Sequence, residues 1–274
     1  MVKNILSIDV EEIFHIEYAK NDNKNYSYRS LQNISLVLNL LSKYNTTATF
    51  FLVGEVAQVF PEIINMIKEE GHEVALHGWS HFPLWRLDTT SFEKEVRKFK
   101  QVHSGCRGFR APSFSLKNET KWALDVIEKY GFKYDSSIFP TWTPLYGVPK
   151  APIEPYYPSR NDISEKGSPE YEILEFPMTV YSLAGIKIPI AGGFWLRFWN
   201  ISLIDRCIKK LNEGGLPAVL YFHNWEFDPG IPKLDLNFIH HFVTYYNLSG
   251  IEKKIRHLLR TFKLTSFTDY IDEV

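Results

Sequence analysis

Short apolar runs alternate with helix-like segments along most of this chain. The runs typical of β-strands lie at residues 4–9, 47–53, 73–77, 107–110, 133–135, 171–176, 185–190, 217–223 and 264–267. Between many of them, apolar side chains recur every three or four residues, as on one face of an α-helix. These stripes consist of Leu31, Ile34, Leu38 and Leu41; Ile63, Ile64 and Ile67; Phe92, Val96 and Phe99; Trp122, Val126 and Ile127; and Leu203, Cys207, Ile208 and Leu211. Repeated strand–helix units of this length predict an α/β fold with a parallel sheet or barrel.

Glycines mark the ends of several predicted helices. Gly71, Gly131 and the pair 214–215 each follow a stripe, at the position where a left-handed residue often ends a helix. At the end of the chain, the run 264–267 precedes residues 268–271, which predict a capped terminal helix.

A proline-rich segment from Pro140 to Pro169 interrupts this pattern. Each proline fixes its backbone φ angle and lacks an N–H donor, which excludes a regular helix or a central strand. We expect residues 140–170 to form a loop insertion over the mouth of the fold, because long ordered loops within a domain are often functional. A surface excursion without function is the alternative. The sequence shows no clear domain boundary, so we expect a single domain, residues 1–274.

Four polar clusters follow predicted strands at the point where each strand ends. They are Asp9-Val10-Glu11-Glu12, His77-Gly78-Trp79-Ser80-His81, Arg110-Ala111-Pro112 and His223-Asn224-Trp225-Glu226. In a fold of repeated βα units, residues beyond the carboxyl ends of the strands converge at one mouth of the sheet or barrel. Carboxylates, paired histidines, an arginine and a further histidine at one mouth predict the site of a metal-dependent hydrolase.

His77 and His81 are the first candidates for metal ligands. Two imidazoles four residues apart can face one cation, and Gly78 favours a turn between them. Catalytic zinc sites commonly use three protein ligands and leave one position for water. We expect the third ligand from the cluster 9–12. Pairs of histidines at this spacing also arise by chance, so the pair alone does not establish a site.

Asp9 and Glu11 lie two residues apart, so their side chains share one face of an extended segment. One carboxylate can hold the metal while the other acts on a water molecule. Glu12 is a rival ligand. Arg110, a lone cation at the end of an apolar run, is the candidate that would keep the second carboxylate charged. Acids at strand ends are also common simply because they face solvent.

His223 ends the run 217–223, which is typical of a buried strand. A histidine in such a position is often a hydrogen-bonded core residue. Its ordinary pKa, near 6.5, also suits a general acid that protonates a leaving amine. Both interpretations are open at this point.

Composition and charge narrow the class of protein. The formal net charge is −1 and there is no basic patch, which argues against nucleic acid as a partner. The two cysteines, Cys106 and Cys207, indicate neither a disulfide framework nor a metal site. No run approaches the roughly 20 apolar residues of a membrane span, and the N-terminus has no signal peptide pattern, so we expect a cytoplasmic protein. The aromatic content of 15% fits an aromatic core or a groove that stacks sugars.

Together, the four clusters resemble those of the NodB-type polysaccharide deacetylases, the family 4 carbohydrate esterases. The similarity runs from Leu6 to about Phe267 and is greatest to the branch that functions in bacterial exopolysaccharide and surface-polysaccharide biosynthesis. Beyond the clusters it includes residues 48–54, 71–77, 107–115 and 134–140. The resemblance implies a distorted (β/α) barrel with about seven parallel strands.

The resemblance also implies roles in catalysis. Asp9 matches the catalytic base, Arg110 matches the arginine that pairs with this base, and His223 matches the general acid. The implied reaction is the removal of N-acetyl groups from an amino sugar or oligosaccharide by a metal-activated water. An O-deacetylase or a small-amide hydrolase is the alternative among enzymes. A non-catalytic sugar-binding scaffold is the alternative outside them.

The metal ligands implied by the resemblance are Glu11, His77 and His81. Zn²⁺ is the ion expected for these donors, and Co²⁺, Ni²⁺ or Fe²⁺ would also suit two nitrogens and an oxygen. Most members of the family carry a second aspartate where this chain has Glu11, and a proline where it has Asn224. Glu12 therefore stays open as a ligand.

Further residues are implied to contact the substrate, and the peptide N–H after Pro112 is implied to stabilise the oxyanion. These substrate-binding candidates are Pro112, Ser113, Tyr134, Asp135 and Trp225. The sequence leaves the oligomeric state open.

Overall fold

The computed structural model describes residues 2–19, 26–183, 185–190, 192–228 and 230–273. The chain divides into two compact units, each of which is described by itself. Unit 1 comprises residues 1–50, 56–73 and 190–274, and unit 2 comprises residues 51–55 and 74–189.

Eight strands of the described residues form the main sheet. They are β1 (Asn4–Val10), β2 (Thr49–Leu52), β3 (Glu73–Leu76), β4 (Gly108–Phe109), β5 (Tyr134–Asp135), β6 (Leu174–Glu175), β9 (Val219–His223) and β10 (Leu264–Thr265). Their order is β10-β1-β2-β3-β4-β5-β6, and β9 also pairs with β1. Each strand coincides with a run that predicts one, so the predicted α/β sheet is confirmed, with eight strands where about seven were expected.

Helices occupy most of the connections between the strands. The α-helices are α1 (Ser30–Ser42), α2 (Gly54–Val59), α3 (Ile63–Glu69), α4 (Thr89–Val102), α5 (Trp122–Lys129), α6 (Gly193–Phe198), α7 (Ile201–Glu213), α8 (Phe238–Tyr245), α9 (Ile251–Thr261) and α10 (Phe267–Glu273). The 3-10 helices are η1 (Ile13–His15), η2 (Glu17–Ala19), η3 (Leu84–Arg86), η4 (Pro112–Phe114), η5 (Asn118–Thr120), η6 (Asn224–Phe227) and η7 (Leu248–Gly250). None of the helices in the described part of the chain has the length and hydropathy that crossing a bilayer requires.

All five apolar stripes lie on helices, namely α1, α3, α4, α5 and α7, and the predicted terminal helix is α10. Positive φ angles at Gly71, Gly131 and Gly215 confirm the predicted helix ends. Helices α2, α6, α8 and α9 were not predicted from the sequence. The first two are six residues long, which is too short for a periodic signal.

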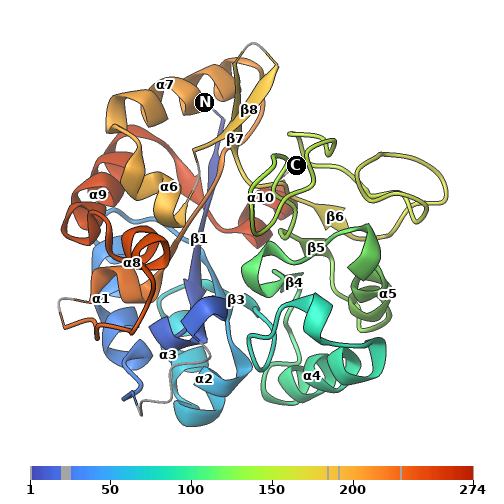
Figure 1. Ribbon diagram of the computed structural model, residues 1–274, viewed down its shortest axis with the longest axis horizontal. Helices are drawn as coiled ribbons and strands as arrows, with labels where there is room; N and C mark the ends of the chain where they lie inside the picture. Colours follow the sequence, from blue (N-terminus) through green and yellow to red (C-terminus); the bar gives the residue numbers. More distant parts are fainter. Residues whose placement is uncertain (1, 20–25, 184, 191, 229, 274) are drawn as a thin grey trace. The chain divides into compact units, whose positions relative to one another are not determined.

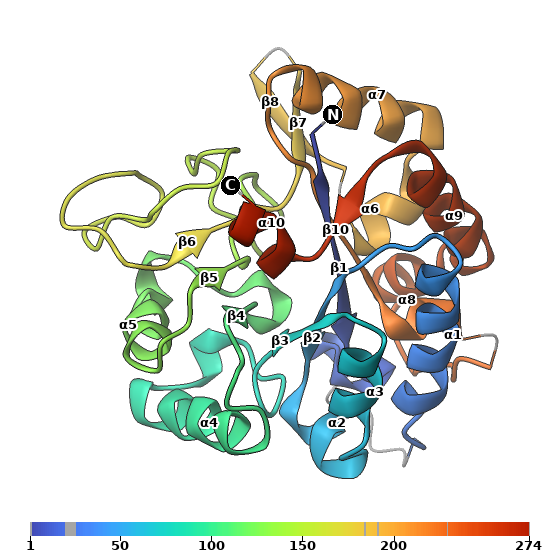
Figure 2. The same cartoon turned by 180° about the vertical axis from the view of Figure 1, so that it is seen from behind.

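The core of unit 1 surrounds β1, which is buried along its whole length. This strand, labelled in Figures 1 and 2, runs parallel to β9 on one side and to β10 on the other, and Figure 2 labels β10 beside it. Strands buried on both faces are typically rich in apolar residues, as β9 is up to Phe222, whereas β1 also buries the polar residues Asn4, Ser7 and Asp9. The pairing with β9 begins at Ile5 opposite Val219 and ends at Asp9 opposite His223.

Unit 2 contains a ladder of three short parallel strands. Phe109 of β4 pairs with Asp135 of β5, which in turn pairs with Glu175 of β6. Helices α4 and α5 contact each other, and the apolar face of α4 is buried. The Asp88 carboxylate caps α4 by accepting the N–H of Ser91 at 2.7 Å.

A separate hairpin of unit 2 departs from the expected pattern. The predicted strand at 185–190 is present as β8 (Ile186–Pro189), but its partner is β7 (Val180–Leu183), in an antiparallel pair outside the main sheet. The run of β7 was missed because its mixed residues Val180, Tyr181 and Ser182 show no clear alternation.

The proline-rich segment has neither a helix nor a regular strand between residues 136 and 173, as predicted. Isolated bridges pair Tyr156 with Glu175, and Pro158 and Ser159 with residues of the same segment. The segment is therefore ordered by a few local pairs. Its place over the mouth of the fold stays a prediction.

The backbone of β4 contacts the ring of Tyr134 on β5, and Gly108 permits this contact. A Cβ atom at position 108 would lie 2.0 Å from Cζ of Tyr134, which is fully buried. We predict that Gly108→Ala lowers the free energy of unfolding by about 1–3 kcal/mol, because the overpacked core must shift. Urea unfolding curves would measure the loss.

Gly105→Ala is the matched control. The nearest heavy atom to a Cβ at position 105 is Cε1 of His103, at an ordinary 3.8 Å. Equal losses of stability in the two variants would contradict the packing argument.

Candidate active site

In unit 1, β1 and β9 bring the predicted base and the predicted acid together. Their parallel register places Asp9 opposite His223. Asp9 is 1% exposed and Glu11 is 2% exposed, so both carboxylates are shielded from bulk water. The pair thus comes from two segments that are more than 200 residues apart in the sequence.

Glu11 is held by the C-terminal cluster. Its Oε1 accepts a hydrogen bond from Trp225 Nε1 at 3.0 Å and lies 3.8 Å from His223 Nε2. The N–H of Glu11 donates to Asn224 Oδ1 at 3.0 Å, and the Asn224 amide donates to Ser30 Oγ at 3.1 Å. Asn224, which stands where the family usually has proline, therefore ties the first and last clusters together.

Glu12 has a different partner, the start of α1. Its Oε1 accepts the N–H groups of Arg29 and Ser30 at 2.9 and 2.7 Å. These are two of the donors that a helix N-terminus leaves unpaired. Burial raises the pKa of Glu12, and the hydrogen bonds from Ser30 and Arg29 oppose this effect. The carboxylate of Glu12 thus serves as a helix cap.

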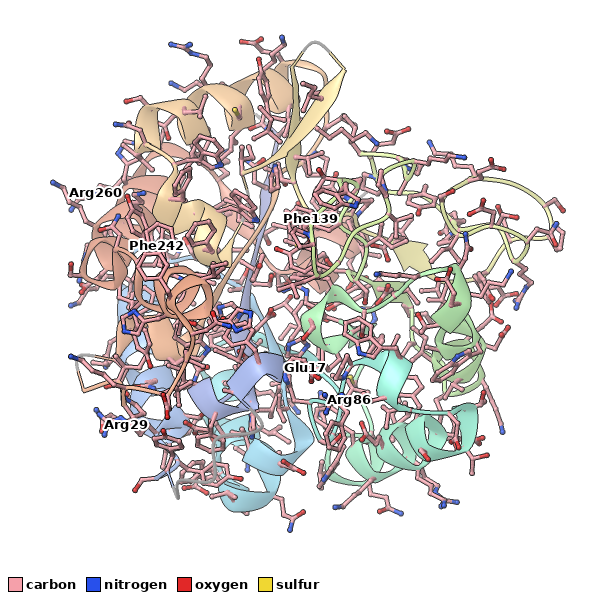
Figure 3. All side chains as sticks on the ribbon, in the orientation of Figure 1. Glu17, Arg29, Arg86, Phe139, Phe242 and Arg260 are labelled. Carbon is pink, nitrogen blue, oxygen red and sulfur yellow. The ribbon has the colours of Figure 1, made fainter. Side chains whose placement is uncertain are left out.

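The ion pair of Arg29 and Asp228 fastens the loop after η6 to the start of α1 (Arg29 is labelled in Figure 3). Arg29 Nη2 donates to Asp228 Oδ1 at 2.8 Å, and Arg29 Nε donates to the other oxygen. Burial alone would raise the pKa of Asp228, but the hydrogen bonds from Arg29 and from the N–H of Gly230 lower it. The carboxylate is therefore charged at neutral pH.

A buried chain of charges orients His223. Its Nδ1 lies 3.3 Å from Glu226 Oε1, which also accepts a hydrogen bond from Arg197 Nε at 3.1 Å. Arg197 is 2% exposed, and its other nitrogens donate to the carbonyls of Val243 and Tyr246. No role was predicted for Arg197 or Glu226 from the sequence, although Glu226 belongs to one of the four polar clusters.

Opposing effects set the charge of His223. Burial would lower its pKa, but the hydrogen bond to Glu226 and the negative charges of Glu11, Glu226 and Asp9 raise it to about 9. Burial would raise the pKa of Glu226, but Arg197 and His223 lower it. The protein alone therefore holds His223 as a cation at neutral pH. Trp225 stacks on this imidazole, with ring centroids 4.9 Å apart.

In unit 2, the two predicted histidine ligands follow β3. The ring centroids of His77 and His81 are 4.9 Å apart, and each side chain is 3% exposed. His77 Nδ1 lies 2.9 Å from the carbonyl oxygen of Arg110. This contact favours the tautomer with the proton on Nδ1, which directs the lone pair of Nε2 to a ligand.

The turn between the histidines is held from α4. Gly78 and His81 have left-handed φ angles of 70° and 54°. Glu95 on α4 accepts the N–H of Trp79 at 2.8 Å and the hydroxyl of Ser80 at 2.5 Å. Sequence reasoning missed Glu95, because only the fold brings this surface helix beside the turn.

Arg110 is fully buried at the end of β4. Its Nε donates to the carbonyl oxygen of Ser136 at 3.0 Å, and Nη2 donates to Ser136 Oγ at 3.0 Å. Its Cζ lies 4.1 Å from the centroid of the Phe51 ring. The structure therefore anchors the guanidinium firmly, and its pairing with the base stays a prediction.

The predicted substrate-binding residues have different surroundings. Pro112 and Ser113 belong to η4, where Ser113 is partly exposed and has a left-handed φ of 55°. Tyr134 and Asp135 are fully buried in β5, and Trp225 is 4% exposed. These last three have packing and hydrogen-bonding roles in the structure. Contact with a substrate stays a prediction for all five.

Each unit thus assembles its own set of functional side chains. Unit 1 brings together Asp9, Glu11 and His223, which are two carboxylates and a cationic imidazole suited to proton transfer. Unit 2 brings together two imidazoles, His77 and His81, and the backbone carbonyl of Arg110 contacts Nδ1 of His77. Two imidazoles are a donor set that divalent transition metals bind.

Comparison with known families accounts for nearly the whole chain. Residues 26–134 match the family described as Polysaccharide deacetylase. Residues 136–272, half of the chain, match the family described as Domain of unknown function (DUF3473). The resemblance to NodB-type enzymes is therefore confirmed, whereas the surface-polysaccharide branch stays a prediction.

Individual relatives agree with this assignment. A peptidoglycan-N-acetylglucosamine deacetylase of Bacillus cereus is 33% identical over 96 residues, which are 32% of this chain and 34% of that protein. A peptidoglycan deacetylase of Helicobacter pylori is 34% identical over 119 residues, which are 41% of this chain and 40% of that protein. The chain thus spans about a third to two fifths of these relatives.

A solved structure extends the likeness to the fold. A proposed polysaccharide deacetylase from Mycobacterium smegmatis superposes with a TM-score of 0.62 over 99% of this chain and 89% of that one, at 19% identity. The fold of this chain is therefore the (β/α) barrel of this enzyme class, as predicted. Residues 26–134 therefore form a polysaccharide deacetylase domain of the NodB type, and residues 136–272 belong to the DUF3473 family.

Proposed function

We propose that the protein is a metal-dependent hydrolase that removes N-acetyl groups from an amino sugar or oligosaccharide in bacterial surface-polysaccharide biosynthesis. The observation that carries this proposal is the buried register pair of Asp9 and His223, with Glu11 beside it. A protein that only bound sugars would have no need for a carboxylate and a protonated imidazole at one place.

We propose that Glu11, His77 and His81 hold one divalent metal ion. Two imidazoles and a carboxylate are a common set for catalytic zinc, and cobalt, nickel or iron would also suit it. The bond of His77 Nδ1 to the Arg110 carbonyl is the outer contact that metal-binding histidines usually make. When bound, the ion supplies Lewis acidity that makes water a stronger nucleophile at neutral pH.

Glu11 is the better ligand of the two glutamates. Glu12 Oε1 is occupied by two helix N–H groups, whereas Glu11 Oε1 accepts the Trp225 indole, and Glu11 rather than Glu12 groups with His77 and His81 as a possible metal site. The indole hydrogen bond fixes the Glu11 carboxylate without neutralising its charge.

Asp9 and His223 would move the protons of the reaction. Asp9 would take a proton from the attacking water, and His223 would give one to the departing nitrogen. His223 suits this task because the carboxylates around it keep it protonated. Glu226 holds Nδ1, so Nε2 is the atom that would deliver the proton. Arg110 would pair with Asp9, as the family resemblance implies.

The protonated imidazole favours an amide substrate over an ester. An amine is a poor leaving group unless it is protonated, whereas an alcohol of lower basicity depends less on the acid. The name of the Bacillus cereus relative, a peptidoglycan-N-acetylglucosamine deacetylase, agrees with this preference. We propose that the partly exposed η4, with Pro112 and Ser113, contacts the acetylated sugar.

Metal binding provides the first test. We predict about one transition metal ion per chain in the wild type and none in His77→Ala or Glu11→Ala, because each variant loses a ligand. Glu12→Ala should keep the metal but lower the free energy of unfolding by about 1–3 kcal/mol, because two N–H groups of α1 lose their acceptor. Elemental analysis and urea unfolding would measure the two effects.

Glu12→Ala serves as the matched control for Glu11→Ala, since both remove a buried carboxylate of the same segment. Loss of the metal in Glu12→Ala but not in Glu11→Ala would reverse the assignment. A wild type that binds no metal even with added zinc would refute the metal site.

Catalysis provides the second test. We predict that the wild type releases acetate from N-acetylated sugars and that Asp9→Asn slows this by about 10²- to 10⁴-fold while keeping the metal, because the base is lost. Acetate release from N-acetyl and O-acetyl sugars, measured side by side, would compare the two substrate classes.

Faster release from O-acetyl sugars would favour an O-deacetylase and contradict the N-acetyl proposal. Binding of a glycan without any turnover would favour a sugar-binding scaffold. Loss of the metal in Asp9→Asn would exchange the roles of Asp9 and Glu11.

A further inference from the structure

Two acidic side chains without a role in the proposed chemistry lie next to each other in the core of unit 2. The register of β5 and β6 pairs Asp135 with Glu175, and both residues are 0% exposed. Two ionised carboxylates at such a place would repel each other and would lack water to screen them. One of the two must therefore carry a proton.

The hydrogen bonds show where this proton belongs. Asp135 Oδ1 accepts the hydroxyl of Ser137 at 2.5 Å, and Glu175 Oε1 accepts the N–H of Ile138 at 3.0 Å. The other oxygens, Asp135 Oδ2 and Glu175 Oε2, are buried and have no hydrogen-bond partner while both count only as acceptors. A single proton shared between these two oxygens satisfies both of them.

Electrostatics assign the proton to Glu175. Burial and the neighbouring charge of Asp135 raise the pKa of Glu175 well above its usual range. Burial also raises the pKa of Asp135, but the hydrogen bonds to Glu175 and Ser137 and the charge of Arg110 oppose this effect and favour its ionised form. Tyr156, the further titratable group beside the pair, has a raised pKa and donates its hydroxyl to the carbonyl of Ile163.

The residues that follow these two acids hold Arg110. Ser136 accepts from the Arg110 guanidinium through both its carbonyl oxygen and its hydroxyl, and this hydroxyl donates to the carbonyl of Phe176. Ser137 Oγ accepts the N–H of Ala111 at 2.7 Å and donates to Asp135. Hydrogen bonds thus connect the carboxyl pair, through Ser137, to the segment that fixes the Arg110 side chain and the N–H of Ala111.

The charge balance agrees with this arrangement. Arg110 contributes one positive charge, Asp135 contributes one negative charge, and protonated Glu175 contributes none. The carbonyl of Arg110 also accepts from His77 Nδ1, so the same anchor orients one of the proposed metal ligands. A loose anchor would therefore disturb both Arg110 and His77.

We infer that Glu175 is a positioning residue, which shares a proton with Asp135 and thereby locks the Ser136–Ser137 segment that holds Arg110. This inference rests on the proposed function, because Arg110 matters for turnover only if it supports the base. It assigns Glu175 no contact with the substrate or the metal.

Two substitutions at position 175 test the inference. In Glu175→Gln, the amide can donate to Asp135 and still accept the N–H of Ile138, so we expect a kcat within about threefold of the wild type. In Glu175→Ala, Asp135 loses its partner, and we expect kcat to fall about 10- to 100-fold with little change in KM, because Arg110 shifts. Glu175→Gln should keep the wild-type metal content, whereas Glu175→Ala, in which His77 is also disturbed, is assayed with added metal at saturation so that kcat reports the shift of Arg110.

Glu73→Ala is the matched control for stability. Glu73 is a hydrogen-bonded acid of β3 that accepts from Thr49 Oγ1 and from the N–H and hydroxyl of Thr268, far in sequence from Arg110 and its serines. It should lower the melting temperature without lowering kcat. A folded Glu175→Ala with wild-type kcat, or a Glu175→Gln as slow as Glu175→Ala, would overturn the inference.

Infrared difference spectra provide a readout that needs no turnover. We expect the carbonyl stretch of a buried, protonated carboxylic acid at pH 7 in the wild type and its loss in Glu175→Gln. Absence of this band in the wild type would overturn the shared proton. The band could also be present in a wild type that binds no metal and releases no acetate. In that case the proposed function would be wrong, and the shared proton of Asp135 and Glu175 would still hold.

Discussion

The parallel register of β1 and β9 is the constraint on which the candidate site of unit 1 depends. Five consecutive pairs, from Ile5–Val219 to Asp9–His223, fix which side chains meet at the end of the two strands. A slip of one residue would turn the whole polar set of one strand to the other face. The apolar residues of both strands are buried on both sides, so such a slip would also bury polar groups without partners. The core therefore protects the alignment of the base with the acid.

Partners that are distant in the sequence also explain how three acids in one short segment acquire different roles. Asp9, Glu11 and Glu12 are all almost fully buried, yet each faces a different partner. Asp9 lies opposite His223 within the ladder, Glu11 accepts from the Trp225 indole, and Glu12 caps α1. A buried carboxylate takes its protonation state and its use from its neighbours. The neighbours here come from β9, from η6 and from the start of α1.

Sequence patterns predicted the elements and the polar clusters well because both signals are local. An apolar run bounded by turns indicates a strand, and a charged residue just beyond it stands out, as Asp9, His77 and Arg110 do. Sequence reasoning could not choose between Glu11 and Glu12, since their difference lies in partners far along the chain. It gave no role to Arg197, Glu95 or Glu175 for the same reason. The spacing of apolar residues in α9 was, by contrast, a readable signal that was overlooked.

Each unit buries one arginine almost completely, and this is costly, because removing a guanidinium from water is seldom repaid by one ion pair. Stability is therefore a poor explanation for Arg110 and Arg197. Both use their nitrogens on fixed acceptors: Arg197 on Glu226 and two carbonyls, and Arg110 on the carbonyl and hydroxyl of Ser136. Glu226 in turn holds His223, and the Arg110 carbonyl holds His77. In unit 1 the Arg197 guanidinium thus orients an imidazole through Glu226, and in unit 2 the Arg110 guanidinium anchors the residue whose backbone carbonyl contacts His77. The rigid planar fork of arginine suits such fixed acceptors better than a lysine would.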